Sequence, residues 1–307
     1  MTNRDTKASI LSAPALGAAT GLCTPPLVAC VRTLLPAIVA DPSGLPAMFS
    51  CESTVLERTF VLGPPLAVGV GTLWSIDAAL VLSGLVMLAG TVAFAAQPGS
   101  RRWRPEPNVQ RPRGGALRSP AMRTLVLILL LTGAVFGTTD VGVTAAAHAL
   151  GSTAAAGPLL GLWGLGSLVG GIVATRNGSS AGGPQRLLLL LVALALGHGA
   201  LLLSTGSLPA IGAVIVLAGA TIAPTVSRIY AMVDTAAPAG TRTEAFSWLL
   251  TASLTGSALG AGVAGALAQG AGARGVFAFV GAAGALAVLV ATLRSRSLEN
   301  AHPGPCP

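Results

Sequence analysis

Long apolar stretches follow one another along almost the whole chain, and the charged residues collect in the joints between them. Each stretch is about 20 residues long, which is the length that an α-helix needs to cross a hydrocarbon core of roughly 30 Å. The runs are continuous, as in LLLLLVALALGHGALLLS, whereas the strands of a membrane barrel alternate apolar and polar residues. Backbone groups in lipid must be satisfied internally, so the pattern predicts an all-α polytopic helical membrane protein.

About nine spanning segments are expected from these lengths. They lie near residues 8–31, 54–73, 76–96, 124–147, 155–175, 187–204, 209–233, 245–268 and 275–293. The first segment is interrupted by Pro14, Pro25 and Pro26. Its basic leader, residues 1–7, also fits the start of a signal peptide, which is the alternative for this segment.

Composition agrees with a lipid environment, because only 9% of the residues are charged while 52% are hydrophobic. The mean hydropathy is +0.76, which leaves too little polar surface to keep a soluble domain of 307 residues dispersed. A net charge of +8 raises the question of nucleic-acid binding. The basic residues are instead spread over several joints, with no nucleic-acid motif or aromatic platform beside them. We therefore expect the lipid bilayer, and no nucleic acid, as a partner.

Arginine is concentrated in the joints on one side of the expected bundle. That side has Arg32, Arg58, Arg101, Arg102, Arg104, Arg111, Arg113, Arg118, Arg123, Arg176, Arg186, Arg242, Arg294 and Arg296. The opposite side has only Arg4, Lys7 and Arg274. Cytoplasmic loops near helix ends are enriched in Lys and Arg, so the first side is expected to be cytoplasmic. The chain then lies in the cell membrane with its carboxyl terminus inside and, for an odd number of spans, its amino terminus outside.

Residues 97–123 form the one long hydrophilic joint, which is rich in Arg, Pro and Gly and has no apolar periodicity. It is typical of a solvated cytoplasmic linker. The linker separates a three-helix part, residues 1–96, from a six-helix part, residues 124–293. A short cytoplasmic tail, residues 294–307, follows.

A weak internal repeat relates the two sides of this linker. GLCTPPLV at residues 21–28 resembles ATIAPTVS at residues 220–227, and each is followed by a charged joint and a Gly-rich helix, at residues 63–69 and 256–262. Two parallel halves related by an axis along the membrane normal are the construction of many secondary transporters. The three spans before the linker correspond to the last three after it, so the first half is expected to lack its opening three helices.

The chain resembles a major facilitator superfamily transporter of the actinobacterial efflux-permease type that begins at the fourth helix. The resembling stretches are GLCTPPLVACVRTLLPAIVADP, ESTVLERTFVLGPPLAVG, RRWRPEP with GGALRSPAMRTL, and TRTEAFSWLLTASLTGSALGAGVAG. The similarity covers residues 15–293. Gly63 and Pro64 match the core of the family's antiporter motif, although Ala67 and Val68 stand where its paired glycines should follow.

This resemblance implies a truncated fold of three plus six helices. The first helix and the family's cytoplasmic Gly/Asp/Arg loop would lie upstream of Met1, which indicates either a misplaced start or a shortened gene. It also implies a secondary-active transporter that exports small organic molecules in exchange for protons by alternating access. The alternative is a transport-inactive membrane remnant, and a membrane-embedded enzyme is more remote. The chain has no nucleotide-binding loop, no catalytic constellation and no ligand-like spacing of its four cysteines, so no cofactor or metal is expected.

Polar groups at membrane depth are the informative candidates, because burying them is costly. Asp140 lies about 24 Å along a helix that starts near residue 124, at 1.5 Å per residue. It is either a proton carrier or substrate contact in a central cavity, or an acid near the outer interface that reaches water. His148 fits an interfacial histidine better than a proton relay. Arg228 and Tyr230 are cavity candidates, with headgroup snorkelling and an interfacial belt position as the alternatives.

Charged residues at the cytoplasmic tips of the two halves are candidates for a gate. They are Arg32, Glu52, Glu57 and Arg58 in the first half, facing Arg228, Asp234, Arg242 and Glu244 in the second. The alternative is that the acids simply begin helices, where they interact favourably with the positive end of the helix dipole.

Overall fold

The structure is a computed structural model. It describes residues 66–102, 114–176, 184–238 and 240–299, with a few scattered residues between 25 and 63. These described residues are 90% helical and include no strand. The chain divides into two compact units, residues 1–49 with 84–105 and residues 50–83 with 106–307. Of the expected spans, 8–31 lies almost wholly outside the described residues, and only residues 66–73 of the next one are described as a continuous helix.

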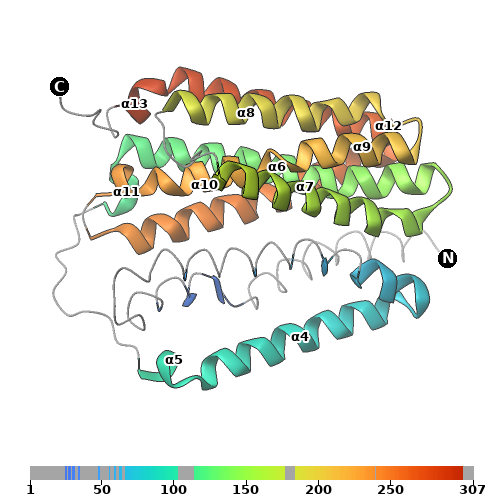
Figure 1. The fold of residues 1–307 in the computed structure, drawn as a ribbon, viewed down its shortest axis with the longest axis horizontal. Coiled ribbons are helices and arrows are strands. Elements are labelled where there is room, and N and C mark those ends of the chain that lie inside the picture. Colours follow the sequence, from blue (N-terminus) through green and yellow to red (C-terminus); the bar gives the residue numbers. More distant parts are fainter. Residues whose placement is uncertain are drawn as a thin grey trace, which may run out of the picture. The chain divides into compact units, whose positions relative to one another are not determined.

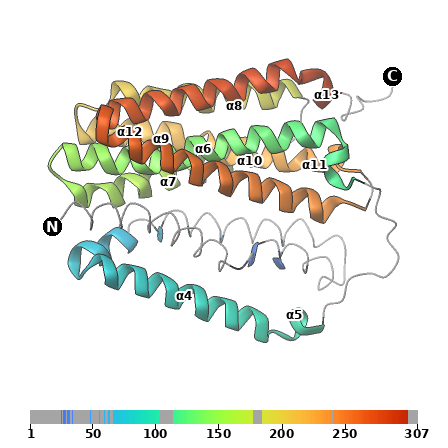
Figure 2. The same ribbon diagram turned by 180° about the vertical axis from the view of Figure 1, so that it is seen from behind.

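Figures 1 and 2 show the helices from opposite sides, with their order along the chain given by colour. In that order they are α4 (Ile76–Ala96), α5 (Pro98–Arg102), η2 (Ala116–Arg118), α6 (Pro120–Ala149), η3 (Thr153–Ala155), α7 (Ala156–Arg176), α8 (Pro184–Gly199), η4 (Ala200–Leu203), α9 (Leu208–Gly219), α10 (Ile222–Ala231), α11 (Val233–Ala236), α12 (Arg242–Leu293) and α13 (Ser295–Glu299).

Helix α4 has the bounds expected from its apolar run, and none of its residues is buried within the described structure. The Ser75 hydroxyl caps its first turn by accepting a hydrogen bond from the amide of Ala78 at 3.0 Å. Within the helix, Ser83 and Thr91 donate to carbonyls one turn earlier, at 2.8 and 2.7 Å. A helix that satisfies its polar side chains on its own backbone is suited to an apolar solvent.

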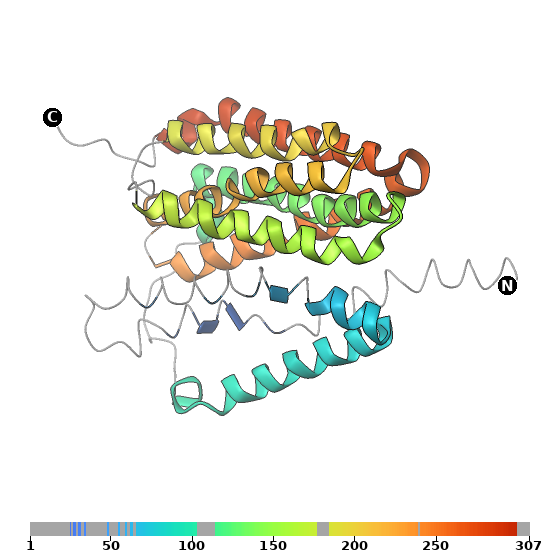
Figure 3. The ribbon, with the colours of Figure 1, turned by 45° about the vertical axis from the view of Figure 1, so that its right-hand side comes forward.

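Helix α12 is 52 residues long, but it is two helices that meet at Gly272. Gly272 has φ 62° and ψ −168°, a left-handed conformation that glycine tolerates and that ends a right-handed helix. The first arm, residues 242–271, turns back there into the second arm, residues 273–293 (Figure 3). Ala245 lies near the start of the first arm and Ala291 near the end of the second. Both belong to the same buried cluster, as expected if the second arm runs back alongside the first.

Six of the described helices are long and apolar enough to cross a membrane. Dividing the longest of them at Gly272 gives seven arms of that length. Every expected span from residue 76 onward has a counterpart among these arms. Helix α6 begins at Pro120, four residues before the span expected from residue 124, because Ser119 caps it and Pro120 occupies a first-turn position that needs no amide hydrogen. The described part of the chain is thus all-α, and its long helices have the length and composition of membrane spans.

The first arm of α12 runs parallel to α6 along a seam of four glycines, Gly133, Gly137, Gly256 and Gly260. A Cβ atom added to any of them would run into the backbone of the other helix. The carbonyl oxygens that face the four glycines, in that order, belong to Ser253, Ser257, Leu130 and Ala134. Glycines four residues apart on both helices let the backbones approach closely, which is how helices associate in lipid.

A second parallel seam joins α7 to α9 and α10. Gly166 and Gly170 face the carbonyls of Val216 and Ala220, and Gly219 faces the carbonyl of Trp163. In both seams, the sequence separation between a glycine of the later helix and the carbonyl it faces is six residues larger than that for a glycine of the earlier helix, so the two seams have the same register. Pro224 contributes here, because it has no amide hydrogen to donate to the Ala220 carbonyl one turn earlier, and that carbonyl points at Gly170.

Residues 114–299 cross the bundle six times, so their two ends lie on the same side. The described arginines at that end are Arg118, Arg123, Arg176, Arg186, Arg228, Arg242, Arg294 and Arg296, and Arg274 lies at the opposite end. We call these the arginine-rich end and the arginine-poor end. Each has its own buried apolar cluster, with Leu125 and Leu187 in the first and Leu201 and Phe277 in the second.

Candidate functional site

An open hollow lies beside α6 and α7 near the arginine-poor end, with a volume of about 530 Å³. Its lining consists of Asp140, Val141, Thr144, Ala145, His148, Thr153 and Leu160. Most of the wall is apolar, and one carboxylate, two hydroxyls and one imidazole supply the polar groups. An apolar hollow with a few polar groups is the usual form of a small-molecule site.

The polar groups of α6 in this hollow follow one face of the helix. Asp140, Thr144 and His148 are each four residues apart, which places them one above another, and all three are exposed. The Thr144 hydroxyl donates to the backbone carbonyl of Asp140 at 2.9 Å, so its own polar group is satisfied on the helix. The hollow therefore offers an acid in its inner part and an imidazole toward the end of the helix.

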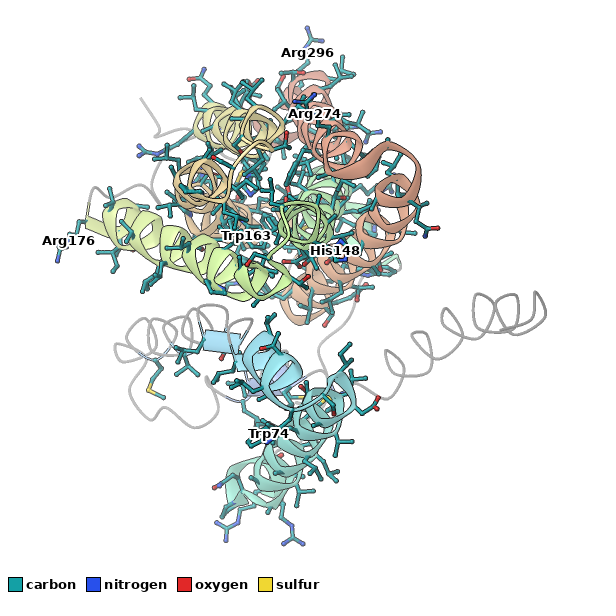
Figure 4. All side chains as sticks on the ribbon, turned by 90° about the vertical axis from the view of Figure 1, so that its right-hand side faces the viewer. Trp74, His148, Trp163, Arg176, Arg274 and Arg296 are labelled. Carbon is teal, nitrogen blue, oxygen red and sulfur yellow. The ribbon has the colours of Figure 1, made fainter. Side chains whose placement is uncertain are left out.

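Three aromatic side chains pack together one turn further into the bundle. Phe136 precedes Asp140 by one turn of α6, and its ring meets that of Trp163 edge to face with centroids 5.8 Å apart. Trp163 in turn meets His198 of α8 edge to face at 5.9 Å. Figure 4 looks along the bundle and shows Trp163 pointing into it from α7, while Arg176 at the end of the same helix points away.

His198 is completely buried, and both of its ring nitrogens have partners. Nδ1 lies 2.9 Å from the carbonyl oxygen of Leu194, which can only accept, so Nδ1 carries the hydrogen. Nε2 accepts a hydrogen bond from the indole Nε1 of Trp163 at 3.1 Å. These two partners fix His198 as the neutral Nδ1–H tautomer and tie α7 to α8.

The other cavity candidates lie away from this hollow. Arg228 belongs to α10 at the arginine-rich end, where its side chain is only 3% exposed. Its positive charge is repelled by that of Arg186. Tyr230 packs against Phe246 with ring centroids 5.7 Å apart, beside the buried cluster of the same end. Asp140 lies about 30 Å along α6 from Pro120, near the other end, so the structure does not bring it together with Arg228 and Tyr230.

Half of the expected gate lies outside the described residues, namely Arg32, Glu52, Glu57 and Arg58, as does Pro64 of the antiporter-like motif. Gly63 is described as helical, with open space where a Cβ would be. Asp234 lies in α11 and Arg242 begins α12 at the arginine-rich end. Glu244 also lies there, and its carboxylate rests against Gly115 and accepts a hydrogen bond from Trp248.

Sequence reasoning did not single out His198, Trp163 or Phe136. A signal was present for His198, because an ionisable residue inside an apolar span is itself a reason for attention. No comparable signal marked Trp163, since an aromatic residue in a membrane helix is ordinary. Among the residues that the structure describes, no group of three or more His, Cys, Asp or Glu side chains forms a metal site.

No protein-family model matches this chain, and no curated protein matches it.

Proposed function

We propose that the chain is a secondary-active transporter of the major facilitator type, which exports small organic molecules in exchange for protons. The observation that carries this proposal is Asp140 in its hollow. An acid on a membrane-length helix, exposed in a mostly apolar hollow, can alternate between holding a proton and pairing with a cationic group of a substrate. Either role needs the same carboxylate, so substrate and proton compete for it.

The two glycine seams support this class of transporter. Its six-helix halves contain two three-helix repeats of opposite orientation. Residues 114–299 form six arms in the order α6, α7, α8, α9–α10, and the first and second arms of α12. If the two repeats are equivalent, arms one, two and three correspond to arms four, five and six. A seam between arms one and five then implies an equivalent seam between arms four and two. Those are α6 with α12, and α9–α10 with α7, the two pairs that share one glycine register.

The arginine distribution supports an orientation in the plasma membrane. Cytoplasmic ends of spans are enriched in arginine, so the arginine-rich end faces the cytoplasm and the carboxyl-terminal tail lies inside. Two further spans before α4 make nine in all, grouped as three and six, and the amino terminus then lies outside. The hollow around Asp140 faces the outer side in this arrangement.

Accumulation of a fluorescent lipophilic cation in cells tests the proposal. Cells that express the chain should hold less of the cation than cells with an empty vector, and a protonophore should remove the difference. Equal accumulation in both cell types, with the protein demonstrably in the membrane, would leave the transport-inactive remnant as the better description.

A further inference from the structure

The end of the linker is folded onto the bundle at the arginine-rich end. We call residues 114–119 the linker strap. Ala116 is completely buried in the apolar cluster of that end. The Arg123 side chain donates from Nε to the carbonyl of Leu117 at 2.6 Å, and the Ser119 hydroxyl caps α6 by accepting from the amide of Met122. The buried Ala116 and these two hydrogen bonds therefore hold the strap against the start of α6 and the adjoining cluster.

A fourth contact joins the strap to α12. Both carboxylate oxygens of Glu244 lie too close to the position that a Cβ of residue 115 would take, so a larger residue there would push the carboxylate aside. Gly115 also has φ 55°, a conformation that other residues adopt at a cost. Trp248, one turn later in α12, donates from its indole nitrogen to Oε1 of Glu244 at 3.3 Å and holds the carboxylate in this place.

The position of Glu244 in the first turn of α12 has a general explanation, since acids stabilise helix starts. That explanation does not account for Gly115, because an acid that interacts only with the helix dipole needs no particular neighbour. The close fit of the carboxylate against a positive-φ glycine is a specific packing contact between two segments more than 120 residues apart.

We propose that Glu244 clamps the linker strap to α12, so that the strap is released when the first arm of α12 moves away from α6. The first arm carries Glu244 at its start and the glycine seam further along, so a tilt that opens the seam also withdraws the carboxylate from Gly115. A clamp of this kind transmits helix movement to the linker that joins the two halves. The clamp is independent of transport, and only its use in a transport cycle rests on the proposed function.

Limited trypsin digestion of the full chain in lipid nanodiscs tests the clamp without any transport measurement. Cleavage after Arg118 requires η2 to open, whereas cleavage after the exposed Arg102 serves as the internal reference. Glu244→Ala should raise the Arg118 rate about fivefold relative to the reference, the size expected when one contact of a locally unfolding segment is lost. Glu299→Ala, an exposed acid at the same end, is the matched control and should leave the ratio unchanged.

A double-mutant cycle separates the clamp from a simple helix-start effect. Gly115→Ala should also raise the ratio, because the new Cβ meets the carboxylate. In a Glu244→Ala background the same change should have a smaller effect, since the carboxylate is gone and only the backbone strain remains. Glu244→Asp withdraws the carboxylate by one methylene and should raise the ratio as well, so it serves if the alanine variant fails to fold. Equal effects of Gly115→Ala in both backgrounds, or an unchanged ratio for both Glu244 variants, would overturn the proposal.

Discussion

The indole nitrogen of Trp163 donates a hydrogen bond to Nε2 of His198 across 3.1 Å and thereby joins α7 to α8 inside the bundle. The two residues are 35 positions apart along the chain. The bond matters because His198 is completely buried, where water cannot replace a lost partner. Trp163 therefore both fills space beside Phe136 and satisfies the one ring nitrogen that the backbone of α8 does not reach.

Replacing Trp163 with Phe should lower the free energy of unfolding by more than the smaller ring volume alone would. The change leaves Nε2 of His198 buried without a donor, which costs about 1–3 kcal/mol. Chemical unfolding in detergent, followed by circular dichroism, measures the free energy of unfolding. Trp74→Phe is the control, because the Trp74 side chain is 79% exposed and its replacement should change stability little.

The double variant Trp163→Phe with His198→Phe checks the cause of that loss. Removing both polar partners leaves nothing unsatisfied, so the double variant should be more stable than the sum of the single effects allows. Additive effects would show that the two side chains act independently and that the hydrogen bond contributes nothing specific.

Alanine at Gly256 should destabilise the parallel seam between α6 and α12. Its Cβ would run into the carbonyl of Leu130, and forcing an extra carbon into a packed contact costs roughly 1–3 kcal/mol. Gly262 is six residues further along the same arm and has nothing within 4 Å of a Cβ. Gly262→Ala should therefore be neutral or stabilising by up to about 1 kcal/mol, since alanine is the better helix former.

Thermal unfolding of both glycine variants in detergent measures this difference. A seam that tolerates Gly256→Ala as well as Gly262→Ala would mean that the two helices are further apart than the structure has them.

Single cysteines in a cysteine-free background should divide into two groups by the side from which they are labelled. Ala154→Cys and Arg274→Cys lie at the arginine-poor end, and Arg118→Cys and Arg296→Cys lie at the arginine-rich end. With an impermeant maleimide, intact cells should label the first pair, and disrupted cells should label all four. Labelling of Ala154→Cys and Arg296→Cys from the same side would contradict the six crossings of residues 114–299.

The spans were predictable because their signal is local. An apolar run such as residues 76–96 determines a membrane-length helix by its own composition, and the structure gives α4 the same bounds. The turn between the last two spans was also expected, although nothing in the sequence distinguishes Gly272 from the glycines at 270 and 275 as the residue that takes up the left-handed conformation.

The close contacts were not predictable, because they depend on which helices become neighbours. Small residues in the span near 245–268 indicate a helix that packs closely, but they do not say that α6 is its partner or fix the register. The same holds for Glu244, which reads as an ordinary acid at a helix start until Gly115 is seen against its carboxylate. His198 lies inside an apolar run, and only its pairing with Trp163 shows how a polar ring is accommodated there.

Transport in proteoliposomes tests the central claim, that Asp140 couples export to protons. Liposomes with an acidic lumen and a clamped membrane potential should take up a permanently charged lipophilic quaternary ammonium ion when the full chain is present. Ammonium chloride, which collapses the pH gradient, should abolish this uptake. Asp140→Asn should lower it to the level of protein-free liposomes, while Asp77→Asn, an exposed acid at the start of α4, should keep the parent rate. Uptake by Asp140→Asn equal to that of the parent, at acidic and neutral pH, would contradict the account.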